Sequence, residues 1–471
     1  MSTSHRDFAR VAGAAATGFI GLMLSLDQAN AGAFAIREQS TVSQGSSYSN
    51  AATCGTGKSI SHMFFNPAAV TCSKSKSVTE SSNSLILPKS EVTTNAAGTN
   101  PFTVGLGSPG DIAIDAFVGS SFGATRLTDN IYVGLGVSAP YGLRTKADNP
   151  HAGIFYGATS EALSVNLTPT VGFNWGDKFS FGAGLQMQYL DVRLTNGIPG
   201  LPGVPPAAVG TVELNAEDWG FGFTLGAMFR PFEGTEIGIG YRSRIGHDLN
   251  GALRGPLGFF AGNPFLAPVA LTNAGGLAAE TEVTTPDVVT ISLSQKVTEQ
   301  VTLSASYEWT NWSVFDTFAV TSPQTPTGLT GITLPFEYVD GHFFSVGGEY
   351  QYNEKLAVRA GIGYELSPIE DDTRAIRLPD NDRLWLSAGG TYDPTEYLSI
   401  SGAYSFLTAF DTPIDINAAN GNPVFNAAAF AGNYSGDVDA NVHIFSVSAK
   451  VKLDKVPFLK GLFDNGKKGI F

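Results

Sequence analysis

The sequence predicts an all-β protein, a 14-stranded antiparallel transmembrane β-barrel plugged by its own N-terminal segment. Stretches in which apolar residues alternate with small polar residues recur along the chain. Charged residues are only 15 %, whereas Gly (55), Phe (32) and Tyr (15) are abundant. After residue 31 no window approaches the roughly 18 consecutive apolar residues that a membrane helix needs. A barrel strand alternates between an apolar lipid face and a polar lumen face, so it needs no such run.

Residues 1–31 are typical of a secretory signal peptide. A positively charged start precedes the apolar stretch Val11–Leu26, and Ala29-Asn30-Ala31 supplies the small-x-small pattern of a cleavage site. A membrane anchor is the alternative, but the stretch is marginal in length and Asp27 follows it. We expect cleavage after Ala31, with Ala33/Phe34 as the alternative position.

Residues 32–75 show no strand periodicity, although they are too long and too apolar for a simple tail. We expect this segment to fold into the barrel as a plug, here called the hatch. It contains the two cysteines of the chain, Cys54 and Cys72. Because an exported protein meets an oxidising compartment, we expect them to form a disulfide.

Residues 76–453 carry the strands. In 178–189, for example, Phe179, Phe181 and Leu185 alternate with Ser180, Gly182 and Gln186. Soluble β-sandwiches also alternate, but these segments are often 11 or more residues long and their polar face is rich in Gly and hydroxyls. The fourteen strand-like segments are 76–89, 111–123, 129–139, 161–175, 178–195, 211–230, 234–250, 282–297, 300–321, 332–352, 354–376, 381–392, 396–411 and 440–453.

The connections alternate between tight turns, which we expect in the periplasm, and long loops, which we expect outside the cell. Several long loops are unusually apolar: Ile198–Pro202, Phe259-Phe260, Phe265–Val269, and Val424-Phe425 with Phe430. They form either loop–loop contacts or a docking surface for an apolar ligand. Residues 454–471 form a short C-terminal tail.

Other classes of function find little support in the sequence. A net charge of −14 disfavours nucleic acid as a partner. The G-x-G-x-x-G match at 105–110 lies in a polar loop without a βαβ unit. The six histidines are scattered and form no metal-binding or catalytic motif. We expect no enzyme, no metal and no cofactor.

Six stretches with recognisable motifs follow one another along the chain: Ala33-Phe34 with Arg37–Ser40, Met63–Ala68, Asp218–Gly222, Gly240–Ser243, Glu308–Ser313 and Leu378–Arg383. In this order they resemble the FadL/TodX family of outer-membrane transporters for long-chain fatty acids and other hydrophobic compounds. The resemblance covers nearly all of the chain after residue 31. It implies a bacterial outer-membrane protein with a 14-stranded barrel and an inward-folded hatch.

The resemblance also implies a passive uptake mechanism. The ligand is held first by the extracellular loops and then inside the barrel, and it leaves sideways into the membrane at a kinked third strand. Phe34 would contact the ligand, and Asn66, Pro67 and Ala68 would set the position of the hatch. The expected partners are a hydrophobic small molecule, outer-membrane lipid and lipopolysaccharide, and the barrel is expected to be monomeric.

One departure from the family pattern leaves the ligand class open. Fatty-acid members hold the carboxylate with basic side chains, and at one such place this chain has Ala319. Arg193 is the candidate at the other, although it could equally pair with Asp191 or Glu213 as a structural arginine. The ligand is therefore either a fatty acid or a less polar hydrocarbon. A general diffusion porin and a surface adhesin or phage receptor are the competing functions.

Overall fold

The computed structural model describes residues 33–148, 150–198, 210–256, 276–428, 431–457, 459 and 463. The predicted signal peptide lies outside the described residues. So do Pro199–Pro202, the apolar loop stretches around Phe259 and Phe265, Phe430, and most of the predicted tail.

One sheet contains all the strands of the described residues. In chain order the strands are β1 (Ser77–Thr94), β2 (Gly110–Asp111), β3 (Ala116–Arg126), β4 (Ile131–Ser138), β5 (Gly142–Lys146), β6 (Thr159–Trp175), β7 (Phe179–Ile198), β8 (Gly210–Phe229), β9 (Thr235–Arg242), β10 (Ile245–Arg254), β11 (Leu277–Thr285), β12 (Val288–Lys296), β13 (Val301–Thr310), β14 (Thr317–Thr321), β15 (Leu329–Pro335), β16 (Gly341–Asn353), β17 (Leu356–Leu366), β18 (Arg383–Tyr392), β19 (Leu398–Ala409), β20 (Thr412–Ile416) and β21 (Tyr434–Lys452). The described helices are all short: α2 (Thr41–Gln44), η1 (Ser61–Phe64), η2 (Pro67–Thr71), η3 (Ala96–Gly98), η4 (Val104–Leu106), η6 (Trp312–Val314), α5 (Pro423–Ala427) and η8 (Leu453–Lys455).

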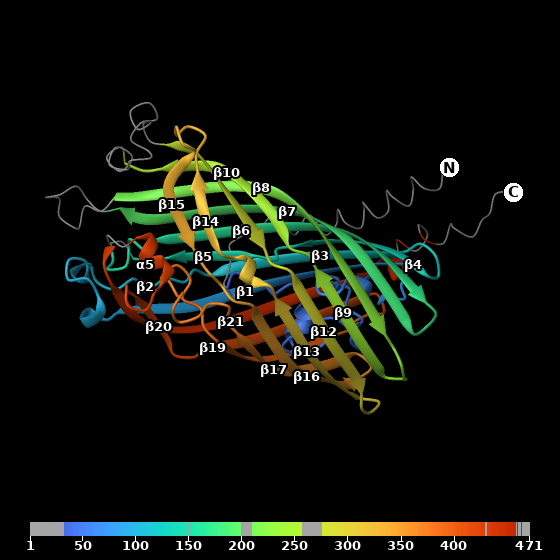
Figure 1. Cartoon of the computed structure of the whole chain (residues 1–471). Coiled ribbons are helices and arrows are strands. Elements are labelled where there is room, and N and C mark those ends of the chain that lie inside the picture. The colour runs from blue at the N-terminus through green and yellow to red at the C-terminus, as the bar shows by residue number, and fades with distance from the viewer. Residues whose placement is uncertain are drawn as a thin grey trace.

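The sheet closes on itself because β1 pairs with β21 in antiparallel register from Val78↔Lys452 to Thr94↔Gly436. Seven pairs of strands are each two parts of one wall-spanning strand: β2/β3, β4/β5, β9/β10, β11/β12, β13/β14, β15/β16 and β19/β20. Counted in this way, the wall has fourteen antiparallel strands, and the predicted plugged barrel is confirmed. Figure 1 shows the long strands side by side along the barrel axis.

Two of the interruptions contain a proline, which cannot continue the ladder. Pro140 falls between β4 and β5, and Pro286 between β11 and β12. A proline nitrogen has no hydrogen to donate to a neighbouring strand. The predicted strand 354–376 was too long, because β17 already ends at Leu366, two residues before Pro368. The following residues form an irregular loop up to β18.

Side chains alternate between two environments, as the period-two pattern predicts. Along the first half of β7, odd-numbered residues such as Leu185 are exposed on the outer wall and even-numbered residues such as Gln186 are buried inside. The outer band carries large apolar residues, among them Phe221 and Val447. No helix within the described residues is long and apolar enough to cross a membrane.

The hatch lies inside the barrel, where Figure 1 shows it in blue behind β12 and β13. Almost all of its residues from Ala33 to Cys54 and from Ser59 to Ser73 are buried. It contains α2, η1 and η2, and a disulfide joins Cys54 to Cys72. The more exposed stretch between these parts, residues 55–58, lies at the end of the barrel that carries the short turns, which is the periplasmic end in such barrels.

Candidate functional site

A cavity of about 220 Å³ lies under the extracellular loops. The outer ends of β7 and β8, strand β15, the loop before β18 and helix α5 enclose it. Its lining is mostly apolar and includes Ile198, Val212, Ile332, Phe336 and Leu378. An apolar cavity with few polar groups is the usual form of a small-molecule site, and we call it the loop pocket.

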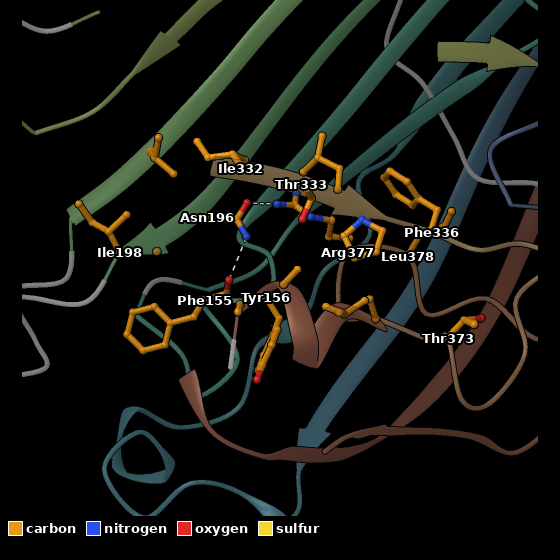
Figure 2. A pocket seen from close by; sticks show the side chains of 18 of the residues that line it. Phe155, Tyr156, Asn196, Ile198, Ile332, Thr333, Phe336, Thr373, Arg377 and Leu378 are labelled. Carbon is orange, nitrogen blue, oxygen red and sulfur yellow. Dashed lines mark hydrogen bonds between the residues drawn. The ribbon is translucent and has the colours of Figure 1, made fainter. Parts of the chain in front are cut away.

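Arg377 brings a positive charge to the lining of the loop pocket. Figure 2 shows it reaching Asn196, with Ile332, Phe336 and Leu378 nearby. Arg377 is buried, with an exposed fraction of 9 %. Its terminal nitrogens donate to Ser160 Oγ at 3.0 Å, to Asn196 Oδ1, and to the carbonyl oxygens of Thr159 and Thr195, both at 3.3 Å.

These acceptors are all neutral, so they do not balance the charge of Arg377. Within the part of the chain that the structure describes, no carboxylate forms an ion pair with it. Burial lowers the pKa of Arg377 to about 10, which still leaves it protonated at neutral pH. The hydrogen bonds of Arg377 to the described residues all come from its two terminal nitrogens.

An aromatic cluster continues inward from the loop pocket. Phe336 lines the pocket and packs on Phe315, with ring centroids 4.7 Å apart. Phe315 in turn contacts Phe34 of the hatch at 5.0 Å, and Phe34 lies 4.6 Å from Trp312. Phe34 and Trp312 are both buried. The hatch therefore places one aromatic side chain against the inner end of the route that starts at the loops.

The wall is interrupted directly beside this cluster. The pairing of β3 with β4 ends at Ser121↔Val137, and β4 ends at Ser138. The remaining part of β3, Ala116–Ser120, is paired with β1 but not with β4. The third strand is therefore bent away from its neighbour at residues 139–141, where Pro140 cannot donate a hydrogen bond.

The hatch closes this interruption. Ile36 N donates to Pro140 O and Gly142 N donates to Phe34 O, both at 2.8 Å. Gln39 Nε2 donates to Ala139 O at 2.8 Å, and Ser120 Oγ donates to Gln39 O at 2.9 Å. Hydrogen bonds from residues 34–39 thus replace the pairing that β3 and β4 lack beyond Ser121↔Val137.

A small cavity of about 40 Å³ lies on the lumen side of the interruption. Phe64, Tyr141 and Arg242 are among its lining residues. Arg242 donates to Phe64 O at 2.8 Å and also to Gln186, and its guanidinium stacks on the Phe64 ring at 4.1 Å. Apolar and cationic surface is therefore present on both sides of Phe34.

Buried charges hold the start of the hatch. Arg37 donates to Glu308 at 2.8 Å and to Glu365 at 3.1 Å, and it lies 4.0 Å from the centre of the Phe343 ring. Arg383 is 3.2 Å from the same Glu365. Removing one partner of a buried pair leaves an unbalanced charge and is strongly unfavourable. This network fixes the segment that closes the wall.

Glu38, the next residue of the hatch, is buried without a partner. Both of its carboxylate oxygens lack a hydrogen bond within the described residues. Burial raises the pKa of Glu38 to about 7, against the lowering effect of Arg37. The hatch therefore contains a carboxyl group that changes its charge near neutral pH.

The predicted hatch motif lies at the start of η2. Asn66 Oδ1 accepts from Ala68 N at 3.0 Å, and Asn66 Nδ2 donates to Ala52 O at 2.6 Å and to Ala227 O of the wall at 3.1 Å. Pro67 takes the first helical position, which needs no donor. Asn66 therefore ties together two hatch segments and β8.

Glycines on the lumen face let the hatch approach this part of the wall. A Cβ at Gly226 would lie 2.0 Å from Asn66 Oδ1, and one at Gly240 would lie 1.8 Å from Phe65 O. A Cβ at Gly182 would lie 2.3 Å from Ala68 N. The polar face is rich in Gly here because the backbone of the hatch occupies the space.

Arg193, the predicted ligand-binding arginine, lies apart from the loop pocket. It has the same strand parity as Leu185 and Met187, which face outward. It is bound by Glu213 at 2.8 Å and Glu161 at 3.4 Å, which matches the structural alternative left open by the sequence. Ala319 is also exposed, next to the buried Val320.

Sequence reasoning did not single out Arg377. It falls in the stretch 367–382, part of which was read as the end of a strand, so its neighbours across the loops could not be inferred. One feature of the sequence could have pointed to Arg377: it is a basic residue between two apolar residues, Ile376 and Leu378, within a long connection. No cluster of three possible metal ligands occurs in the described residues.

Comparison with known proteins agrees with this architecture. The model of a family described as outer membrane protein transport protein (OMPP1/FadL/TodX) matches residues 22–453. A long-chain fatty acid transport protein of Escherichia coli O6:H1 is 26 % identical over 324 residues, which cover 63 % of this chain and 70 % of that protein. The 47 kDa outer membrane protein of Pasteurella multocida is 27 % identical over 399 residues, covering 80 % and 88 %.

Solved structures show the same fold. A Pseudomonas aeruginosa FadL homologue superposes with a TM-score of 0.77 at 22 % identity, covering 89 % of this chain and 99 % of that one. The Ralstonia pickettii toluene transporter TbuX superposes with a TM-score of 0.56 at 18 % identity, covering 83 % and 94 %. At these identities the structures establish the barrel and not the ligand.

Proposed function

The chain belongs to the OMPP1/FadL/TodX family of outer membrane transport proteins, and from this premise we propose that it carries hydrophobic compounds passively into the cell by lateral release. It is a multi-pass β-barrel of the bacterial outer membrane, and its relatives are transporters of fatty acids or toluene and not enzymes. A monomeric state and contact with lipopolysaccharide remain predictions.

One observation carries the proposed route: the hatch segment that closes the wall also supplies an aromatic ring, Phe34, to the cluster that continues inward from the loop pocket. Phe34 packs on Phe315 and Trp312, while its carbonyl oxygen accepts from Gly142 across the interruption. A ligand that displaces Phe34 would therefore act on the seal at the same time. Binding and opening are coupled through one residue.

The physical advantage of this route is that it avoids water. Each Å² of apolar surface moved into water costs about 25 cal/mol. An apolar solute that enters at the loops and leaves at residues 139–141 would pass along the aromatic cluster, where most of the side chains it meets are apolar. The apolar interior of the membrane then supplies the driving force, and no energy source is required.

Arg377 favours an anionic amphiphile over a neutral hydrocarbon as the ligand. It is the cation of the loop pocket, and it has no carboxylate partner among the described residues. A carboxylate with an apolar tail would balance the charge and place the tail against Phe336 and Ile332. The chain thus has a candidate carboxylate site in addition to Arg193, which is paired with Glu213 and Glu161.

An open porin fits the described residues less well, because the buried hatch fills the lumen and contacts the wall through Asn66 at Gly226 and through the backbone of Phe65 at Gly240. A polar solute would meet the Arg37–Glu308 network and the docked hatch motif instead of water.

A reversible cross-link tests the lateral route. Ala35 and Tyr141 form an antiparallel bridge across the interruption, so the variant Ala35→Cys/Tyr141→Cys can join the hatch to the third strand. We expect the oxidised variant to lose at least tenfold in uptake of a long-chain fatty acid and to recover on mild reduction. The parent chain, oxidised and reduced, controls for loss of Cys54–Cys72. Parental uptake by the fully cross-linked protein would rule out release at residues 139–141.

A further inference from the structure

A second hollow, at the end of the barrel with the short turns, takes no part in the proposed route. It encloses about 310 Å³ between the hatch and the wall. The hatch contributes residues 56–58, which lie just inside the loop closed by the Cys54–Cys72 disulfide, and residues 73–75, which follow it. The wall contributes side chains from β16, β17, β18, β19 and β21.

The hollow concentrates positive charge in an otherwise acidic chain. Its five cationic side chains are Lys58, Lys74, Arg359, Lys450 and Lys452. Its acidic side chains are Glu349 and Asp393, which leaves an excess of three positive charges, whereas the chain as a whole carries −14. A local excess of this kind attracts anions, since the surrounding charge has the opposite sign.

None of the four lysines of the hollow forms an ion pair with a carboxylate among the described residues. Lys450 Nζ donates to the carbonyl oxygen of Gly57, and Lys452 Nζ donates to that of Glu396 at 3.2 Å. Lys58 and Lys74 form no hydrogen bond or ion pair with the described residues. Each of the four therefore keeps its charge available to a bound anion.

Arg359 adds an independent observation, because it has a buried donor without an acceptor in the described part of the chain. Its side chain is almost completely buried; Nε pairs with Glu349 and Nη1 donates to Thr391 Oγ1 at 2.8 Å. Nη2 has no acceptor within the described residues. It lies 3.3 Å from the position of a Cβ on Gly57, which also lines the hollow. A buried donor without an acceptor is unfavourable unless a ligand or water completes it.

The cations lie on two separate parts of the molecule. Lys58 and Lys74 belong to the hatch, while Arg359, Lys450 and Lys452 belong to the wall. Burial and the charges of Lys74 and Lys452 lower the pKa of Lys58. Like charges of the hatch and the wall thus lie close together here, and an anion between them would attract both parts.

We propose that this hollow binds one phosphate-type oxyanion, which ties the periplasmic side of the hatch to the barrel wall. An excess of three charges suits a multivalent anion better than a single carboxylate. The hydroxyl groups of Thr56, Ser73 and Ser75 add neutral donors to the cations. The same chemistry is offered by free phosphate and by the phosphate of a lipid headgroup. This inference does not depend on which compound the barrel transports.

Equilibrium dialysis of the full chain in a phosphate-free maltoside detergent tests the proposal with inorganic phosphate. We expect one bound phosphate per chain, and at least tenfold weaker binding by Lys58→Gln/Lys74→Gln. The matched control is Lys296→Gln/Lys355→Gln, which removes the same charge from exposed short-turn positions at the same end of the barrel. The control should bind phosphate like the parent.

Two further measurements separate the sources and the effect on the hatch. Micelles doped with phosphatidylglycerol replace phosphate in a parallel titration; binding there alone assigns the oxyanion to a lipid headgroup. Trypsin cleavage after Lys58 and Lys74, followed by mass spectrometry, should slow at least threefold with the bound ligand but not with equal ionic strength of chloride. Absence of binding in both titrations, or equal loss in both double variants, overturns the proposal.

Discussion

At the scale of single residues, the loop pocket depends on the unpaired charge of Arg377. We predict that Arg377→Gln weakens binding of palmitate by about tenfold to a hundredfold, because a charged hydrogen bond contributes about 1.5–3 kcal/mol. Binding of hexadecanol, which has the same tail and no charge, should change little. Isothermal titration of the detergent-solubilised protein measures both ligands.

Arg193→Gln is the matched control for Arg377→Gln, because it removes the same group from an ion pair outside the loop pocket. It should leave both affinities unchanged. Equal weakening of palmitate and hexadecanol by Arg377→Gln would show a packing role and remove the carboxylate assignment. Failure of the parent to bind either ligand would instead count against the proposed function itself.

Glu38 gives the hatch a pH dependence whose sign can be worked out. Its pKa is about 7 in the folded protein, above the ordinary value of 4.5, so the folded state binds the proton more tightly. The free energy of unfolding therefore contains a contribution of about 3 kcal/mol from Glu38 that is fully present below about pH 4.5. This contribution is lost as the pH rises from 4.5 through 7. Arg37, Glu365 and Arg383 are the charged groups that act on it.

We accordingly predict that Glu38→Gln reduces the loss of thermal stability between pH 5 and pH 8. Tryptophan fluorescence in detergent follows the unfolding. Glu354→Gln removes an exposed carboxyl group in a short turn and should keep the parental pH slope. A parental slope in Glu38→Gln as well would mean that the buried carboxyl group is not the titrating group.

Residue roles were less predictable than the fold, and the reason is physical. Phe34 and the motif Asn66-Pro67-Ala68 could be proposed because they stand in a recognisable order along the chain. The environment of Arg377 could not, because its partners come from residues near 160 and 196. The direction in which Arg193 points could not be predicted either. It depends on which face of β7 the odd-numbered residues occupy near the strand's outer end, and the sequence does not specify the register there.

At the scale of elements, hatch and wall fit together because glycines leave room. A Cβ at Gly240 would lie 1.8 Å from Phe65 O, a backbone atom that cannot move alone. We predict that Gly240→Ala destabilises the docked hatch by about 1–3 kcal/mol and increases permeability to small antibiotics. Gly246→Ala is the control, since a Cβ there meets no atom within 4 Å. Similar permeability of the two variants would mean that this contact does not hold the hatch.

The strands themselves were predictable because alternation is a local property of the sequence. Thirteen expected segments overlap a wall-spanning strand closely, and only 354–376 ran on past Pro368 into a loop. Interruptions such as residues 139–141 were suggested by Pro140. What fills an interruption was not predictable, because the hydrogen bonds come from residues a hundred positions earlier.

At the scale of the whole molecule, the barrel and its hatch are separable in principle. β1 and β21 close the wall through a continuous ladder from Val78 to Thr94 that needs no hatch residue. We predict that deletion of residues 33–75 leaves a barrel that folds, because the lipid-facing apolar band and the closed hydrogen-bond network remain. Its lumen, lined by small polar side chains, should then fill with water.

Planar-bilayer recordings test this prediction. The intact chain should show little ion conductance, since the buried hatch occupies the lumen, whereas the deletion variant should show large, stable channels. The variant should also lose selective uptake of hydrophobic ligands, because Phe34 and the seal at residues 139–141 are removed together. If the intact chain conducted like an open pore, the diffusion-porin function would replace the transporter. The hatch would then not be the gate of this barrel.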